Sequence, residues 1–167
     1  MSLKVIITGD THIPGRGKKL PECLLTACSK ADLIIHTGDW SSPEVFETLS
    51  AITDVKGVYG NVDGEEIRSL LPAQQVIKVG GLRIGLVHGH GDKKTTEQRA
   101  VEAFADEQVD AVIFGHSHIP VIKYFKGTLL MNPGSPTDKR KLPFYSFITL
   151  KIGDELLPEL VLFRDKS

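Results

Sequence analysis

Residues that can bind metal ions or transfer protons follow five short apolar runs in this chain of 167 residues. The segments that follow the runs combine glycine with aspartate, asparagine or histidine, and they hold all six histidines of the chain: residues 9–12, 36–39, 60–63, 88–91 and 115–118. Carboxylate, amide and imidazole ligands suit Mn²⁺, Fe²⁺, Ni²⁺ or Zn²⁺, and no thiolate accompanies them as in a structural zinc site. The pattern therefore predicts a metal centre with mixed oxygen and nitrogen ligation.

Seven residues of these segments are candidate metal ligands: Asp10, His12, Asp39, Asn61, His88, His116 and His118. A tetrahedral ion takes four ligands, so seven are too many for one site. If Asp39 bridges two ions, the ligands divide into two sets of four, and a two-metal centre favours in-line displacement at phosphorus. We expect two divalent cations, with manganese as the first choice and nickel, iron or zinc as alternatives.

Each candidate taken alone also has an ordinary structural interpretation. Asp10 and Asn61 follow predicted strands, where Asp and Asn are common in turns and helix caps. His116 and His118 alone are equally consistent with a loop that binds nothing. Only the complete set in order favours metal binding.

Several neighbouring residues are predicted to support the centre or to contact a substrate. His36 is expected to pack or to orient a ligand, and Asp63 to orient a neighbour or cap the next helix. Arg16 and Asn132 are candidates for substrate binding, with a solvated loop and a Pro-Gly turn as the respective alternatives. Trp40 is expected either to pack internally or to stack on a substrate ring.

Apolar runs and turn residues predict that strands and helices alternate in the first half of the chain. The expected strands are 3–8, 32–37 and 54–59, and the expected helices are Leu20–Ala31, one that opens at Ser42-Pro43, and Glu65–Leu71. This order implies a parallel sheet with right-handed crossovers. The carboxyl ends of its strands bring Asp10, Asp39 and Asn61 to one edge, where ligands collect in α/β proteins.

The second half of the chain predicts a second sheet. Gly80-Gly81 indicates a hairpin between strands 75–79 and 82–87, and Thr95–Gln108 reads as an amphipathic helix with Val101, Phe104 and Ala105 on one face. Further strands are expected at 110–114, Val121–Phe125, Thr128–Met131, Tyr145–Ile152 and Leu156–Phe163. We expect an α/β fold with two packed mixed β-sheets flanked by helices, a four-layer α/β/β/α sandwich, as a single domain over residues 1–167.

Composition restricts the partners and the compartment. The formal net charge of −1 argues against general nucleic-acid binding, which needs a basic surface. No apolar stretch approaches the roughly 20 residues of a membrane span, and there is no signal-peptide pattern, so no membrane partner is expected. Cys23 and Cys28 fit neither a disulfide framework nor metal spacing, which favours a reducing, cytoplasmic location.

The five segments together resemble a known family. Asp10-x-His12, Gly38-Asp39, Gly60-Asn61-x-Asp63, His88-Gly89 and Gly115-His116-x-His118 look like the motifs of the calcineurin-like metallophosphoesterase superfamily. The chain length and the segment 132–135 resemble its small single-domain prokaryotic phosphodiesterase branch. One such motif is common by chance, whereas five in order are specific, and they cover most of the chain.

The resemblance implies a division of the ligands and a reaction. One ion would be held by Asp10, His12, Asp39 and His118, and the other by Asp39, Asn61, His88 and His116. A hydroxide that bridges the ions would attack phosphorus in line, while Asn61 helps to hold the phosphate oxygens. The expected function is a dinuclear metal-dependent phosphodiesterase acting on small-molecule or nucleotide phosphodiesters. The small branch often self-associates, so a homo-oligomer is among the expected partners.

One position departs from the wider superfamily. Many members have a histidine directly after the motif asparagine as the leaving-group acid, and Val62 cannot donate a proton. Either His90 or a metal-bound water replaces it, or the substrate needs a good leaving group, which favours diesters over unactivated monoesters.

Two alternative functions stay open. One is a phosphomonoesterase or pyrophosphatase that uses the same metals. The other is a non-catalytic metal-binding scaffold, because a eukaryotic retromer subunit resembles the same branch and serves mainly in protein assembly.

Overall fold

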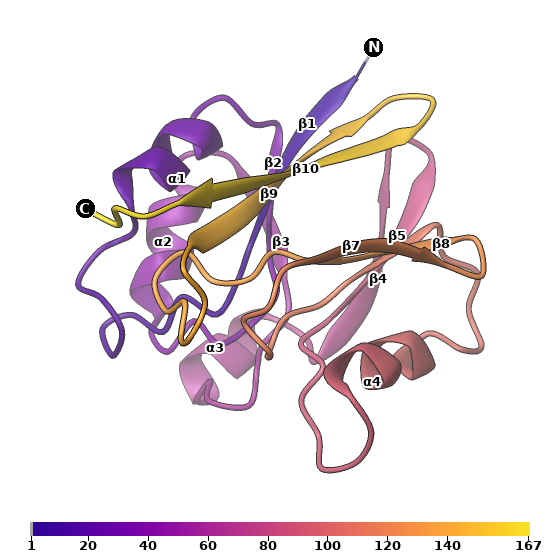
Figure 1. Cartoon of the computed structure of the whole chain (residues 1–167), viewed down its shortest axis with the longest axis horizontal. Helices are drawn as coiled ribbons and strands as arrows, with labels where there is room; N and C mark the ends of the chain where they lie inside the picture. Colours follow the sequence, from indigo (N-terminus) through magenta and orange to yellow (C-terminus); the bar gives the residue numbers. More distant parts are fainter. Residues whose placement is uncertain (1) are drawn as a thin grey trace.

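The computed structural model describes residues 2–167, which form ten strands and four helices (Figure 1). The strands are β1 (Leu3–Thr8), β2 (Leu33–His36), β3 (Asp54–Gly57), β4 (Gln74–Val79), β5 (Leu82–Val87), β6 (Ala111–Ile113), β7 (Val121–Phe125), β8 (Thr128–Asn132), β9 (Tyr145–Ile152) and β10 (Leu156–Phe163). The helices are α1 (Glu22–Cys28), α2 (Pro43–Ser50), α3 (Glu65–Leu70) and α4 (Thr96–Ala103).

The strands form two five-stranded sheets, and both sheets are mixed. In the first sheet, of order β10-β9-β1-β2-β3, the three strands β1, β2 and β3 are parallel, while β9 and β10 add antiparallel. In the second sheet, of order β4-β5-β6-β8-β7, the strands β5, β6 and β8 are parallel and the two edge strands are antiparallel. The prediction of two mixed sheets is therefore confirmed.

Side chains alternate between the two faces of each strand, and this divides the apolar residues into one core between the sheets and two cores under the helices. Val5 and Ile7 of β1 are fully buried between the sheets, where they pack with residues of the second sheet such as Ile84. Ile6 points the other way, into a cluster with Leu24 of α1 and with residues of α2 and α3. Successive strand side chains must face opposite sides, so a run of apolar residues fills both layers.

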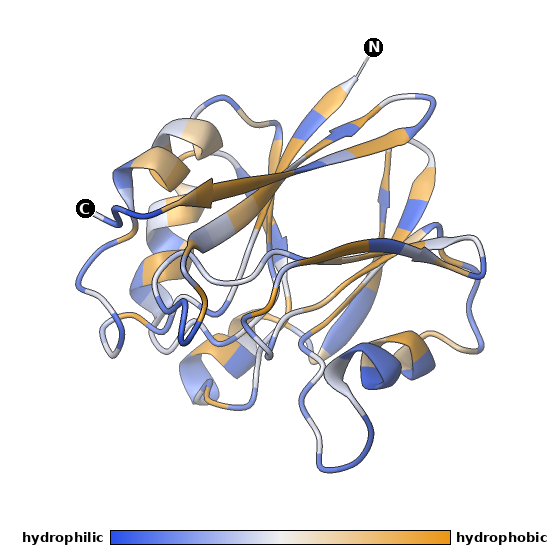
Figure 2. Ribbon diagram, viewed as in Figure 1, coloured by the Kyte–Doolittle hydropathy of each residue, from blue (hydrophilic) through white to orange (hydrophobic). Residues whose placement is uncertain are grey.

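A third cluster joins α4 to the outer side of the second sheet, with Phe104 packed near Val112. Helices therefore cover both outer faces, with α1, α2 and α3 beside the first sheet and α4 beside the second (Figure 1). Hydrophobic residues concentrate in the strands (Figure 2). The expected order of four layers, α/β/β/α, is confirmed.

Helices α1 and α4 end well before the predicted residues because the chain turns there toward the next strand, and α1 also begins at Glu22 instead of Leu20. After α1, the N–H groups of Lys30 and Ala31 donate to carbonyls only three residues back, and Asp32 N–H already donates to Lys4 O of β1 at 2.8 Å. After α4, similar tight turns follow Phe104, and Ala105 is exposed instead of lying on the buried face. The start of α4 is well defined, because Thr95 and Gln98 form a reciprocal capping box.

No helix within residues 2–167 is both long enough and apolar enough to span a lipid bilayer.

Candidate metal centre

Six of the seven predicted ligands lie together where strands of the two sheets end. Within each of two groups the ligand atoms are within 4.8 Å of one another: Asp10 with His12 and His118, and Asp39 with His88 and His116. The members of each group come from both sheets, since they follow β1 or β2 of the first sheet and β5 or β6 of the second. The fold thus unites residues more than a hundred positions apart into two candidate cation sites.

Asp39 lies between the two groups. Its Oδ2 is 3.2 Å from His88 Nε2 in its own group and 3.5 Å from His12 Nε2 in the other. Asp10 Oδ1 is 3.7 Å from Nε2 of both His88 and His118, which brings the two groups into direct proximity. A carboxylate within reach of both groups is what a bridging ligand requires.

Four of the ligand atoms are buried without any hydrogen-bond partner in the described chain: Asp10 Oδ1, His12 Nε2, His88 Nε2 and His118 Nε2. Buried polar atoms are nearly always paired, and one left unpaired costs about 1–3 kcal/mol. Four such atoms converge at one place, and all are of types that bind Mn²⁺, Fe²⁺, Ni²⁺ or Zn²⁺. Coordination of divalent cations would satisfy them, so the residues present fit two ions.

Backbone carbonyl groups orient two of the imidazoles. Thr37 O is 2.8 Å from His88 Nδ1, and Asp138 O is 2.8 Å from His118 Nδ1. Because a carbonyl oxygen only accepts, each Nδ1 carries the hydrogen, and in the neutral ring the lone pair lies on Nε2. Nε2 is the atom that faces the carboxylates, which is the arrangement of a histidine that binds a metal.

The charges in this cluster shift one another's pKa values. Burial raises the pKa of Asp10 to about 7. Burial alone would lower the pKa of His88, but its close contact with Asp39 and the charges of both carboxylates raise it to about 8. The same contact with His88 lowers the pKa of Asp39 to about 2, against the effect of burial. Cations at this site therefore compete with protons on Asp10 and His88.

Two other ligands are ready to bind at neutral pH. Burial lowers the pKa values of both His116 and His118 to about 4. Their rings are therefore neutral at pH 7, with a lone pair free for a cation.

The backbone is strained at five of the six clustered residues. Asp10, His12, Asp39, His116 and His118 have φ between 45° and 71°. Residues with a side chain seldom adopt this left-handed region, and each instance costs of order 1–3 kcal/mol. Such strain gathers at functional sites, where the surrounding structure holds side chains in positions that an ordinary loop would not give.

Two motif glycines let the backbone approach the carboxylates closely. A Cβ on Gly60 would lie 2.1 Å from Asp39 Oδ1, and a Cβ on Gly115 would lie 2.9 Å from Asp10 Oδ2. Any larger residue would displace a ligand, which explains glycine at these two positions.

Asp63 holds the loop that carries Asp39. Its Oδ2 accepts the N–H of Asp39 at 2.9 Å and the N–H of Gly60 at 2.8 Å, and its Oδ1 accepts the N–H of Ser41 at 2.8 Å. Asp63 therefore orients its neighbours, whereas the N-cap of α3 is Gly64.

His36 is fully buried and supports the same loop from the other side. Its Nδ1 accepts the N–H of Gly38 at 3.1 Å, and its Nε2 is 3.1 Å from Thr11 Oγ1. Trp40 stacks on the ring with centroids 3.6 Å apart and donates to Val58 O. Trp40 is fully buried, so its role is packing and not substrate stacking.

Residues 3–155 match the sequence model of a protein family, the calcineurin-like phosphoesterase superfamily domain. The chain belongs to this superfamily. A protein of Methanothermobacter thermautotrophicus described as a probable metallophosphoesterase is 34% identical over 160 residues, covering 93% of this chain and 90% of the relative. The vacuolar protein sorting-associated protein 29 of Schizosaccharomyces pombe is 34% identical over 137 residues, covering 80% and 72%. Vps29 of Entamoeba histolytica, solved in complex with zinc, superposes with a TM-score of 0.75 at 27% identity, covering 96% of this chain and 99% of that chain.

The remaining predicted residues lie around the cluster. Asn61 is exposed on the loop after β3, and this loop is joined to the centre because Val62 N–H donates to Asp39 Oδ1 at 3.1 Å. His90 is exposed and belongs to neither group. Its ring centroid is 5.6 Å from that of His88 and 6.4 Å from that of His116, so it borders the second group.

Asn132 is bonded within the protein, and its predicted contact with a substrate stays a prediction. Its side chain is fully buried, with Nδ2 donating to Gly115 O and Ser117 Oγ at 3.1 Å and Oδ1 accepting Gly134 N–H at 2.9 Å. Asn132 thus holds the loop that carries His116. The sequence shows a polar residue at a strand end but not the direction in which its side chain points.

Arg16 lies beside the centre and not within it. The side chain is 67% exposed, and its Nε is 3.4 Å from Asp138 Oδ2. Contact between Arg16 and a substrate stays a prediction.

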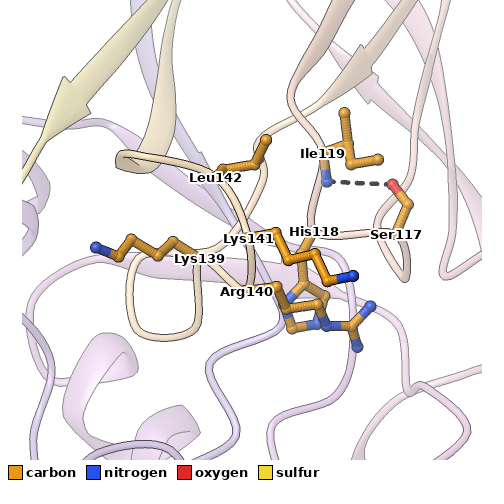
Figure 3. Close-up of a pocket in the computed structure, with 7 residues that line it drawn as sticks. All are labelled: Ser117, His118, Ile119, Lys139, Arg140, Lys141 and Leu142. Carbon is orange, nitrogen blue, oxygen red and sulfur yellow. Dashed lines mark hydrogen bonds between the residues drawn. The ribbon is translucent and has the colours of Figure 1, made fainter.

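Two features of the metal centre were not predicted from the sequence: the backbone carbonyl groups that orient its histidines, and a run of positive residues beside it. Thr37 and Asp138 act on the histidines through carbonyl oxygens, and no sequence signal marks a particular carbonyl. The run Lys139-Arg140-Lys141, by contrast, is a visible cluster of charge, and the structure places it next to His118 (Figure 3).

Proposed function

We propose that this chain hydrolyses phosphodiesters with two divalent cations at the candidate metal centre. The observation that carries the proposal is the set of four buried, unpaired ligand atoms beside Asp39. Membership of the phosphoesterase superfamily supports it independently.

The ligands divide between two ions. Asp10, His12, Asp39 and His118 would hold one ion, and Asp39, Asn61, His88 and His116 the other. Two bound cations would lower the pKa of a bound water and neutralise negative charge on the phosphate. Manganese is our first choice, with nickel, iron and zinc as alternatives, and the zinc complex of the Entamoeba histolytica relative supports the last.

The exposed amide of Asn61 is suited to a further task, which is to hold a phosphate oxygen while charge develops there. A fixed donor of this kind acts more strongly in the transition state than in the ground state. Asn61 therefore has a proposed role both as a ligand and in substrate binding.

The groups near the centre favour esters with good leaving groups. Val62 is 49% exposed at the position where many superfamily members place a proton donor, and valine has no proton to give. His90 is the candidate to assist the leaving group, but burial, and then the charge of His88, lower its pKa. A mostly neutral imidazole is a weak acid catalyst at pH 7, so we propose diesters as substrates over unactivated monoesters.

A second candidate function is a protein-interaction scaffold. Its support is the 34% identity with a protein named for vacuolar protein sorting, together with large exposed apolar side chains such as Tyr124 on edge strand β7. A single domain over residues 1–167 and self-association also remain proposals.

Hydrolysis of bis-p-nitrophenyl phosphate beside p-nitrophenyl phosphate tests the function. The protein is treated with chelator and then assayed with Mn²⁺, Ni²⁺ or Zn²⁺. We expect metal-dependent cleavage of the diester and much slower cleavage of the monoester.

Asp39→Ala is the variant for this assay because it removes the shared ligand, and Asp54→Ala, at an exposed carboxylate of β3, is the matched control. Loss of both ions and of turnover only in Asp39→Ala supports the proposal. If Asp39→Ala retained two ions, the assignment of Asp39 as a ligand of both ions would be refuted. If the parent bound metal but hydrolysed neither ester, the scaffold function would be favoured over the phosphodiesterase.

A further inference from the structure

A pocket of about 450 Å³ opens directly beside the first group of candidate ligands (Figure 3). Its lining comes from two segments, Ser117–Ile119 after β6 and Lys139–Leu142 between β8 and β9. His118 belongs to both the pocket and the metal centre, since its Nε2 is 3.7 Å from Asp10 Oδ1. The volume is in the range of small-molecule sites. A substrate with its phosphate at the centre therefore has room for one ester arm in this pocket.

Two positive side chains on the pocket wall have no acidic partner. Within residues 2–167, the arginine and lysine ion pairs involve Arg16, Arg83, Lys94 and Lys123. Arg140 and Lys141 take part in none of them, and both are exposed. Figure 3 shows their side chains extending in the same direction past His118, while Lys139 points the other way.

The positive side chains on the opposite side of the same loop already contact other groups of the protein. There a second cavity of about 390 Å³ is lined by Arg16, Lys139, Lys166 and, from the shared edge, Arg140 among others. Lys166 Nζ donates to Arg16 O at 2.8 Å and to Thr137 O at 2.9 Å, and Lys139 Nζ lies 5.1 Å from the centre of the Tyr145 ring. These contacts engage Lys166 and Lys139, and Arg16 is paired with Asp138, so the positive charge that stays without a partner in this loop is that of Arg140 and Lys141.

Hydrogen bonds fix the loop that carries Arg140. Asp138 N–H donates to Ser135 Oγ at 2.9 Å, Arg140 N–H to Asp138 Oδ1 at 3.3 Å, and Leu142 N–H to Lys139 O at 3.0 Å. A loop whose backbone is held in place loses less entropy when its side chains bind an anion than a mobile loop does.

We propose that this pocket receives one ester arm of the substrate and that Arg140 and Lys141 bind a second phosphate group on that arm. The inference rests on the proposed function and narrows its substrate class to phosphodiesters that carry an additional phosphate. Arginine and lysine are the usual partners of phosphate, and the apolar side chains of Ile119, which is exposed, and Leu142, which is half-buried, give the rest of the arm a surface to contact.

Two chromogenic esters with the same leaving group test the substrate class. Thymidine 5′-(p-nitrophenyl phosphate) has one phosphate, and its 3′-phosphorylated form has two. We expect Mn²⁺-loaded protein to show kcat/KM about tenfold higher for the second ester, and Arg140→Gln/Lys141→Gln to abolish this preference. Lys30→Gln/Lys126→Gln removes the same charge at two exposed lysines outside the pocket and should keep the preference.

A binding measurement separates the pocket from the reaction. Titration calorimetry compares thymidine 3′,5′-bisphosphate with thymidine 5′-monophosphate, in chelator and with Mn²⁺. We expect the bisphosphate to bind the parent about tenfold more tightly, or about 1.4 kcal/mol, and the Arg140→Gln/Lys141→Gln variant to bind both equally.

Equal affinities in the parent, or an unchanged preference in the variant, would overturn the inference. If bis-p-nitrophenyl phosphate is not hydrolysed but the bisphosphate preference depends on Arg140 and Lys141, the proposed function fails while the pocket assignment stands.

Discussion

Replacing Asp10 by asparagine should stabilise the protein in chelator, although it removes a predicted ligand. Asp10 is fully buried, and burial raises its pKa from 3.8 to about 7. When folding raises the pKa of a carboxyl group, that group stabilises the folded state most at pH values below the pKa that it has in the unfolded chain. That advantage is lost as the pH rises through the folded pKa. Above pH 7 the folded protein must therefore keep a charge where its environment disfavours one, and asparagine has no charge.

The size of the effect follows from the pKa values. The difference between 3.8 and about 7 corresponds to about 4 kcal/mol at 1.36 kcal/mol per pH unit. Part of this is offset, because the Asp10 charge helps to raise the pKa of His88 to about 8 and so stabilises the protonated ring. Asparagine retains an acceptor for the N–H of His116, which lies 3.0 Å from Asp10 Oδ2. We expect a net gain of about 2 kcal/mol at pH 8, or about 4–8 °C in Tm for a chain of this length.

Thermal unfolding followed by circular dichroism measures this gain. Asp10→Asn, the parent and Asp54→Asn, a control at an exposed carboxylate, are compared at pH 8 in chelator and with Mn²⁺. In chelator only Asp10→Asn should gain, and its gain should vanish near pH 4, where the parent Asp10 is protonated. With Mn²⁺ the order should reverse, because bound ions stabilise the parent more than a variant that has lost a ligand. A lower Tm for Asp10→Asn in chelator at pH 8 would refute the reasoning.

Three further outcomes are expected. His90→Ala should slow hydrolysis of a diester with a poor leaving group while two ions stay bound, as measured by metal analysis, and unchanged turnover would remove His90 from the reaction. Metal affinity should rise between about pH 6 and 8 and then level off, because Asp10 with a pKa of about 7 and His88 with a pKa of about 8 must lose protons to bind cations. Calorimetry in buffers of different ionisation enthalpy would show the released protons, and a pH-independent affinity would contradict both pKa values. Asp63→Asn should lower the free energy of unfolding by about 2–4 kcal/mol in urea, because an amide cannot accept all three backbone N–H groups that Asp63 accepts. Stability within about 0.5 kcal/mol of the parent would show that the loop does not depend on Asp63.

The order of elements was predictable because it depends on local signals. Glycine pairs, prolines and alternating apolar residues mark strands and turns within a few positions, and strands such as Tyr145–Ile152 were predicted with the bounds that the structure has. The helix ends were less predictable. Whether Ala31 belongs to α1 depends on the bond between Asp32 N–H and Lys4 O, which joins segments far apart in the chain.

The roles of single polar residues were predictable only where the chemistry leaves one choice. Asp63 and His36 could be assigned to support because they stand next to ligands in the motifs. For Asn132 the sequence leaves two roles open, because the same amide can contact a substrate or hold a loop, and only the structure shows that it is buried and bonded to the loop. The loop 139–141 has no motif, so its place beside His118 could not be inferred.

The sequence alone determined the two-sheet fold and the set of candidate ligands, because both depend on residue types at short spacings: apolar runs that form buried strands, and the polar residues that directly follow them. Tertiary structure decided how those ligands group, with Asp39 between two clusters and the Nε2 atoms of three histidines left without partners. It also decided that the charge of Arg140 and Lys141 borders the centre. These properties arise from contacts between segments that lie close together only after the sheets have packed, so no local pattern in the chain encodes them.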